Sequence, residues 1–214
     1  MKTTSSIDIL EINDMYGNVQ KRVRLHMPKV IVTKEEWIEK GICYFAVGGA
    51  EALLIEKMAR ELGCSKSSFY WYFGDRAQFL RCIVDEWVRR ATYEIMQSSL
   101  MEPSVDNRIK VVLTSMFSFH SGQDFVYYLR RLGQENSQYG ELLEQVEQQR
   151  IHFMTSLLLE RGYSLEQASS LALVIYHFYL GWYERNKYLG SAADVDQPTA
   201  LMWKYVIQTG GANE

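Results

Sequence analysis

The 214-residue sequence predicts an all-α protein of about nine helices. Most of the chain after residue 30 places apolar residues three and four positions apart, which is the spacing of one buried helix face. Two segments, Thr33–Glu36 and Ser164–Gln167, have the capping-box pattern that begins a helix. Each of the three prolines lies just before a helical pattern, and nothing between them indicates a strand.

The front of the chain predicts four helices in close succession. The first begins at the capping box of Thr33 and ends near Gly48-Gly49. The second has apolar residues at helical spacing and stops at Gly63. Ser65 can cap a third helix, and Asp75 a long fourth one that continues to about Gln97.

The rear of the chain continues as helices, which are expected at roughly 104–120, 123–133, 138–161, 165–189 and 198–208. The segment 171–189 is apolar or aromatic nearly all round in its first half, which is too much for a helix with one buried side. We therefore expect it to pack against its own domain and a second subunit, giving a homodimer through residues of about 165–208. A central helix in a monomeric bundle is the alternative.

Residues 1–29 have a different pattern. Apolar and polar residues alternate from Val19 to Met27, and a turn-like Asn-Asp-Met-Tyr-Gly-Asn stretch precedes them at 13–18. This alternation predicts an N-terminal extension that forms a β-hairpin. Its face with Arg22 and Arg24 is either solvated or in contact with DNA.

Composition narrows the class of protein. The hydrophobic content of 47% supports a sizeable core, and no run approaches the 18 apolar residues of a membrane span. The first residues lack the basic and apolar blocks of a secretion signal, so we expect a cytoplasmic location and no membrane partner. Cys43, Cys64 and Cys82 have no disulfide or zinc spacing.

Five consecutive aromatic residues, Phe69 to Phe73, form the densest aromatic run of the chain. Wound as a helix, the run puts Phe69, Tyr72 and Phe73 on one apolar face. The other face carries Lys66, Ser67, Tyr70 and Trp71, whose polar groups suit phosphates and base edges. With the helix before it and the turn Leu62–Cys64, this segment predicts a helix-turn-helix.

The charge distribution agrees with this interpretation. Net charge is −3 overall, but residues 1–93 sum to +2 and residues 94–214 to −5. A basic front and an acidic rear suit a protein that approaches nucleic acid at one end.

The stretch from Gly49 to Leu80 resembles the DNA-binding domain of TetR-family transcriptional regulators. The similarity rests on Met58-Ala59, on Leu62-Gly63-Cys64-Ser65-Lys66-Ser67-Ser68-Phe69-Tyr70-x-Tyr72-Phe73 and on x-x-Arg76-x-x-Phe79-Leu80. It implies a DNA-binding domain at 30–80 and a ligand-binding and dimerisation domain at 81–214. By this resemblance, Tyr70 and Arg76 hold phosphates of a palindromic operator, and the expected DNA-binding residues are Ser65, Lys66, Ser67, Ser68, Tyr70, Trp71, Tyr72 and Arg76.

Several positions depart from the family pattern. The chain has Leu53-Leu54 where the family often has a Thr pair, one of which touches phosphate. Ser67, Tyr72 and Arg76 replace a frequent Gly, His and Lys. The alternative is therefore a TetR-like regulator that binds DNA more weakly and acts mainly through a protein partner.

The resemblance also implies a ligand cavity in the rear domain, and the aromatic and Met-rich candidate lining fits a small apolar or aromatic ligand. Our hypothesis is that a ligand or partner bound there changes the angle of the fourth helix and releases a repressor from DNA. The same aromatic stripes could equally be plain core. No metal-ligand spacing, cofactor motif or catalytic constellation stands out, so an enzyme is not expected. The candidate lining residues are Met116, Phe119, His120, Phe125, Tyr128, Phe153, Met154, Leu157, Tyr176 and His177.

Overall fold

The computed structural model describes residues 32–118, 124–187 and 196–208. All of them belong to one compact unit, Ile31–Glu214. The expected β-hairpin at residues 1–29 lies outside the described residues.

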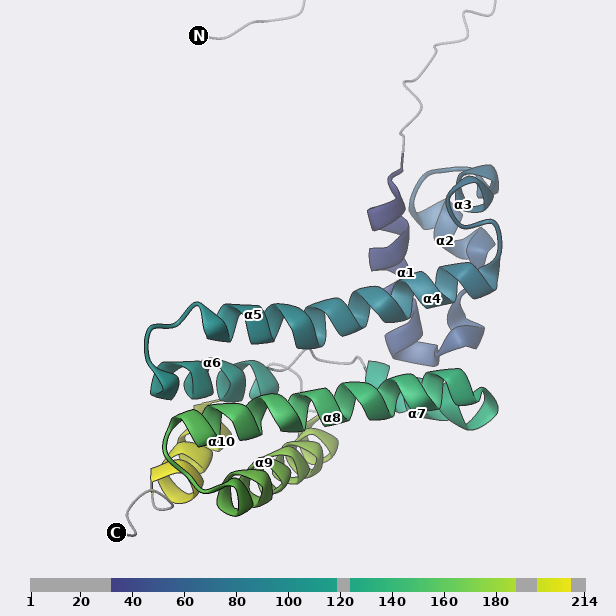
Figure 1. Cartoon of the computed structure of the whole chain (residues 1–214). Coiled ribbons are helices and arrows are strands. Elements are labelled where there is room, and N and C mark those ends of the chain that lie inside the picture. Colours follow the sequence, from purple (N-terminus) through teal and green to yellow (C-terminus); the bar gives the residue numbers. More distant parts are fainter. Residues whose placement is uncertain (1–31, 119–123, 188–195, 209–214) are drawn as a thin grey trace, which may run out of the picture. The chain divides into compact units, whose positions relative to one another are not determined.

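The described residues are helical throughout and contain no strand, so the predicted all-α class is confirmed (Figure 1). If α4, η2 and α5 are counted as one continuous helix and α10 with η4 as another, these residues form nine helices besides the short 3₁₀ turn η1. In order, the elements are α1 (Lys34–Gly48), η1 (Ala50–Ala52), α2 (Ile55–Glu61), α3 (Lys66–Phe73), α4 (Arg76–Val88), η2 (Arg89–Glu94), α5 (Ile95–Leu100), α6 (Val105–Phe117), α7 (Phe125–Glu135), α8 (Ser137–Glu160), α9 (Leu165–Asn186), α10 (Asp196–Met202) and η4 (Trp203–Gln208).

The helices α1, α4 and α9 begin at the caps that the sequence predicts, whereas α10 begins at Asp196 and contains Pro198 in its first turn. Both capping boxes are formed: the hydroxyls of Thr33 and Ser164 accept hydrogen bonds from the backbone N–H three residues on, and the side chains at those positions bond back. The Asp75 carboxylate accepts from the N–H of Gln78 at 2.7 Å and starts α4. Ser65 holds the N-cap position of α3 through its backbone, without a side-chain cap bond.

The long fourth helix differs from the expected regular α-helix. Figure 1 shows α4 and α5 on one continuous rod, but the turns from Arg89 to Glu94 between them are π-helical. A π turn widens the helix and weakens the ordinary backbone ladder. Here the carbonyl of Ala91 accepts a hydrogen bond from the Arg150 guanidinium of α8 at 3.1 Å, and Thr92 is buried beside it.

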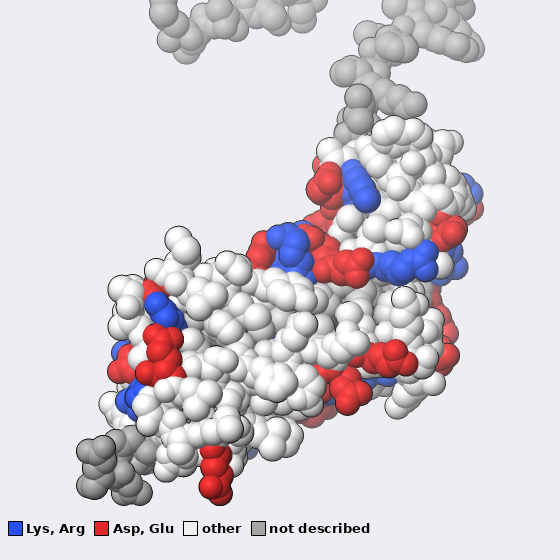
Figure 2. All heavy atoms as spheres, in the orientation of Figure 1, with Lys and Arg blue, Asp and Glu red and all other residues white. Residues whose placement is uncertain are grey.

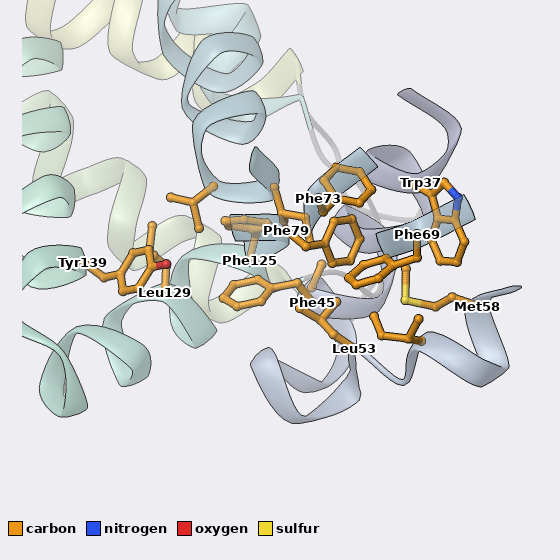
Figure 3. Packing of buried hydrophobic residues seen from close by; sticks show 14 of the residues in the cluster. Trp37, Phe45, Leu53, Met58, Phe69, Phe73, Phe79, Phe125, Leu129 and Tyr139 are labelled. Carbon is orange, nitrogen blue, oxygen red and sulfur yellow. The ribbon is translucent and has the colours of Figure 1, made fainter. Parts of the chain in front are cut away.

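The front helices share one core with α7 and the start of α8 (Figure 3). Trp37, Phe69 and Phe79 meet edge to face, with ring centroids 5.0 to 6.4 Å apart. The same core continues through Phe45, whose ring lies 4.5 Å from that of Phe125 on α7. This continuity ties the orientation of α1 and α3 to that of the rear helices.

A second core lies between α6, α8, α9 and the C-terminal helices α10 and η4. Ile109, Leu113, Phe117, Leu158 and Ile175 are at most 1% exposed in it. The two cores together frame the cavity described below.

Glycines at the corner between α7 and α8 allow the closest backbone approach. A Cβ added at Gly133 would lie 2.8 Å from the Cα of Gly140, a backbone atom that cannot rotate away. We therefore expect Gly133→Ala to lower the free energy of unfolding by about 1–3 kcal/mol or more in urea titrations.

Ser98→Ala provides the control, because this side chain is exposed on α5, away from the corner between α7 and α8. It should leave stability unchanged or raise it slightly, since alanine is the better helix former. Equal stability of the two variants would contradict the proposed close contact of α7 and α8.

Candidate nucleic-acid interface and ligand cavity

Helices α2 and α3 are joined by a tight turn. Gly63 has a φ of 70°, a left-handed conformation that glycine adopts without strain. The N–H of Cys64 then donates to the carbonyl of Ala59 at 3.0 Å and closes the end of α2. The result is the helix-turn-helix geometry that the sequence predicts.

The inner face of α3 is aromatic and buried. Phe69 is 0% and Phe73 4% exposed, and their ring centroids lie 5.3 Å apart. Phe69 also packs edge to face on Trp37 of α1. Figure 3 shows both phenylalanines directed into the core, so the inner half of the aromatic run is accounted for by packing.

The outer face of α3 is open to solvent. Trp71 is 78% exposed and Tyr70 55%, and both lie among the large exposed hydrophobic residues of the described chain. Lys66 and Ser67 on the first turn are exposed as well. Two large aromatic residues in water next to a cation are unusual for a surface that binds nothing.

Two of the expected DNA-binding hydroxyls are engaged inside the protein. Ser68 accepts a hydrogen bond from the indole Nε1 of Trp37 at 3.3 Å, and Tyr72 donates to the carbonyl of Val32 at 3.0 Å. Both side chains are half-buried. These bonds fix the rotation of α3 relative to α1, so the outer face points away from the core.

Arg76 lies at the start of α4, beside the end of α3. Its guanidinium is exposed and donates to the carbonyl of Ala50 at 3.2 Å. A guanidinium that uses one donor in this way keeps others for a phosphate.

Basic groups of this region stand beside acidic ones, as Figure 2 shows for the visible face. Lys66 forms an ion pair with Glu56 of α2, and both groups are exposed. The hydrogen bond and charge of Glu56 raise the pKa of Lys66, and those of Lys66 lower the pKa of Glu56. A phosphate that binds Lys66 must therefore compete with a carboxylate.

The start of α2 lacks a side-chain hydroxyl. Leu53 is buried, and Leu54, 54% exposed, stands at the N-cap position with no side-chain cap bond. No side-chain cap therefore satisfies the backbone N–H groups of this first turn.

A cavity of about 550 Å³ lies behind the helix-turn-helix. Its wall is built by α1, by the α4–η2–α5 rod and by α6 to α9, so it reaches from the front helices into the rear bundle. The wall includes half of the residues expected from sequence: Met116, Phe125, Phe153, Met154 and Tyr176.

The other expected residues are placed differently. The phenol of Tyr128 donates to the carbonyl of Val47 at 2.6 Å, Leu157 is buried in the second core, and His177 is exposed on α9. None of these three lines the cavity wall. Phe119 and His120 lie outside the described residues.

Sequence reasoning missed the polar part of the cavity wall. Glu39, Arg90, Thr92 and Arg150 line it, together with Trp87, Tyr179, Trp182 and Tyr183. A single charged residue on an amphipathic helix normally indicates a solvated face, so Arg150 gave no signal before the fold was known.

Three tyrosines of α9 face the cavity. Burial raises the pKa of Tyr176, Tyr179 and Tyr183 above the ordinary value for tyrosine. The phenols therefore stay neutral in the physiological range, and each can act as donor or acceptor.

The part of the chain that the structure describes contains neither a candidate metal site nor a candidate membrane-spanning helix. No group of three or more His, Cys, Asp or Glu side chains is arranged to hold a metal ion there. None of the described helices combines the length and the apolar character needed to cross a membrane.

No protein-family model matches the sequence, and no curated protein is similar enough to match it. Solved structures do match. A TetR transcriptional regulator from Chloroflexus aurantiacus J-10-fl has a TM-score of 0.65 at 16% identity, over 81% of this chain and 93% of that one. A transcriptional regulator of the TetR/AcrR type from Aquifex aeolicus VF5 gives 0.62 at 15%, over 83% and 99%.

A third matching structure contains a bound ligand. The transcriptional regulator FadR from Bacillus subtilis, solved in complex with stearoyl-CoA, has a TM-score of 0.56 at 14% identity, over 80% of this chain and 98% of that one. With identities this low, the similarity establishes architecture alone. The chain has the fold of the TetR/AcrR-family transcriptional regulators.

Proposed function

We propose that this protein is a sequence-specific DNA-binding transcriptional regulator of the TetR type, with α3 as its recognition helix. The observation that carries the proposal is the division of α3 into two faces. Phe69 and Phe73 are buried, while Tyr70 and Trp71 are 55% and 78% exposed. A helix fixed in this way at the second position of a helix-turn-helix can enter the major groove.

Each residue has a role in this proposal. Tyr70 and Arg76 hold backbone phosphates, because a phenol and a guanidinium are suitable donors. Lys66, Ser67 and Trp71 face base edges. Ser65 lies where the start of α3 meets the DNA backbone. Ser68 and Tyr72 act inside the protein, since their bonds to Trp37 and Val32 set the rotation of α3.

The rear half supplies control. A ligand in the 550 Å³ cavity would contact α1 and the α4–η2–α5 rod, both of which also support α3. A structural neighbour, the transcriptional regulator FadR of Bacillus subtilis, was solved in complex with stearoyl-CoA, whose long acyl chain supports a ligand with an apolar part here too. We infer that ligand binding tilts α4 and releases the operator, so that the protein acts as a repressor.

A homodimer is needed to read a palindrome. The face of α9 that turns away from its own core carries Leu173 and Val174, 43% and 53% exposed, with exposed His177 and Gly181 further along it. Leu201 and Tyr205 add exposed apolar surface at α10 and η4. We assign this surface, within residues 165–208, to the dimer interface.

The second candidate function is a regulator with weak DNA binding that acts through a protein partner. Two observations favour this candidate. Leu53-Leu54 supply no hydroxyl at the start of α2, and Lys66 is already in an ion pair with Glu56. A gel shift at increasing salt separates the two candidates. If contacts to phosphates drive binding, the logarithm of the DNA-binding constant must fall linearly with the logarithm of the salt concentration.

Replacing Trp71 by Ala should weaken binding to genomic fragments selected by the wild-type protein by about tenfold or more, because a base-edge or stacking contact is lost. Arg76→Gln should weaken binding to all DNA sequences alike and lower the salt dependence of binding, because a phosphate contact is lost. Both effects are measured by gel shift and fluorescence anisotropy.

Met101→Ala is the matched control for Trp71, because Met101 is 85% exposed at the far end of the α4–η2–α5 rod. It should bind DNA like the wild type. If Trp71→Ala also binds every fragment with unchanged affinity and preference, α3 does not read bases.

Val174→Glu should convert the dimer to a monomer at micromolar concentration, because it places a charge in an apolar interface. Light scattering after size exclusion gives the mass, and Gln97→Glu on exposed α5 is the control. A mass that Val174→Glu leaves unchanged would place the interface elsewhere.

A further inference from the structure

We propose that the cavity ligand is an apolar monocarboxylate whose carboxylate binds Arg150, and that this contact competes with the bonds by which Arg150 holds the π turn η2. The inference rests on the proposed function, since it names the ligand class and the mechanism of control for the same cavity.

Arg150 projects from α8 to the cavity wall and contacts neutral groups. Its Nη2 and Nε donate to the hydroxyl of Thr92 at 2.8 and 3.0 Å, and Nη2 also donates to the carbonyl of Ala91 at 3.1 Å. The guanidinium lies over the ring of Trp87 with its carbon 5.3 Å from the centroid. The structure gives no ion pair to Arg150 within the described residues.

The second arginine on the same wall is compensated. Arg90 pairs with Glu39 of α1 at 2.5 Å and with Glu86 at 2.6 Å. Glu86 also binds Arg89 at 2.6 Å, and these two arginines lower the pKa of Glu86 to about 2, so it stays ionised. The charge of Arg90 is therefore already matched, and that of Arg150 is not.

The remaining charges near Arg150 also have partners. Glu147, one turn earlier on α8, binds Arg130 at 2.6 Å. Asp124 and Glu184, which line a small neighbouring cavity that Arg150 also borders, hold Lys187 at 2.7 and 2.8 Å. A half-buried guanidinium among neutral oxygens gains most from an incoming carboxylate, which it can bind through two parallel hydrogen bonds.

The rest of the wall selects for an apolar body. Trp87, Met96, Met116, Phe153 and Trp182 present large hydrophobic side chains to the cavity. A volume of 550 Å³ falls within the range of about 300–1,000 Å³ that is usual for small-molecule sites. Arg150 is the wall's one cation that lacks an ion pair among the described residues, and most of the remaining wall is apolar or aromatic. This arrangement fits an amphipathic monoanion better than a neutral or a polyanionic ligand.

The contacts of Arg150 also link the cavity to the DNA-binding end. Ala91 and Thr92 belong to the π turn, in which the regular backbone ladder is interrupted. A carboxylate that takes up the Nη2 and Nε donors removes the bonds that hold this turn. The rod from Arg76 to Leu100 then loses a fixed point, and its front end is the helix on which Phe69 and Phe73 pack.

The test uses the full-length protein with decanoate, decanol and methyl decanoate as probes, and measures their binding by calorimetry and tryptophan fluorescence. Decanoate should bind at least about tenfold more tightly than either neutral probe, because a charged hydrogen-bond pair is added. Decanol binding as tightly as decanoate, or no saturable binding of decanoate, overturns the proposal.

Variants locate the site. Arg150→Gln should lower decanoate affinity at least about tenfold and leave decanol affinity unchanged, whereas Arg150→Lys should retain part of it. Arg90→Gln, which removes the compensated arginine of the same wall, should preserve the preference for decanoate. Arg150→Gln weakening both probes equally, or Arg90→Gln abolishing the preference, contradicts the assignment.

A separate measurement, amide hydrogen exchange, tests whether the ligand loosens the π turn. Decanoate should speed amide hydrogen exchange between Arg89 and Ile95 in the wild type but not in Arg150→Gln, and faster exchange in both overturns the competition mechanism. Decanoate binding through Arg150 in a protein that fails to bind any DNA would defeat the proposed function and leave this ligand assignment standing. DNA binding without decanoate binding would overturn the ligand assignment and leave the proposed function standing.

Discussion

The contact between Phe45, Phe125 and Trp87 is the constraint on which the rest of the structure depends. The ring of Phe125 lies 4.5 Å from that of Phe45 on α1 and is stacked at 4.8 Å on that of Trp87 on α4. Backbone and side-chain bonds reinforce the junction, since Asp124 N–H donates to the carbonyl of Ala46 at 2.7 Å and Tyr128 to that of Val47 at 2.6 Å. Because the helices meet through close-packed rings, α1 and α4 cannot shift relative to α7 without losing this packing.

This junction explains how a helix as short as α3 can be held firmly in place. Helix α3 has eight residues, too few to be stable in isolation, and it depends on the aromatic core beneath Phe69 and Phe73 for its position. The same core borders the cavity through Phe125 and Trp87. A molecule in the cavity would therefore touch residues of the core that supports α3, the proposed recognition helix. Such a shared contact is the physical requirement for control of one site by the other.

Much of the fold could be predicted because its signals are local. Capping residues such as Thr33, Asp75 and Ser164, and helical spacing of apolar residues, depend on neighbours within one or two turns. The two faces of α3 followed from the same spacing for Phe69, Tyr70 and Trp71. Tyr72 shows the limit: its ring joins the inner side, but its hydroxyl finds Val32, 40 residues away in sequence.

What the sequence could not supply are features created by the meeting of distant segments. The π turn at Arg89–Glu94 is accompanied by contacts from Arg150, 58 and 59 residues further on. The polar wall of the cavity arises in the same way, from α1, η2 and α8 together. The aromatic core that joins the front helices to α7 is another such feature.

The most direct test of a shared core is amide hydrogen exchange at increasing urea concentrations below the unfolding transition. If the Phe45, Phe125 and Trp87 junction unites the front and rear helices, the slowest amides of α1, α4 and α7 should open with the same free energy and the same urea dependence. Opening of α1 to α3 at clearly lower urea than α7 and α8 would show that the recognition helix is an independent unit and would contradict the account.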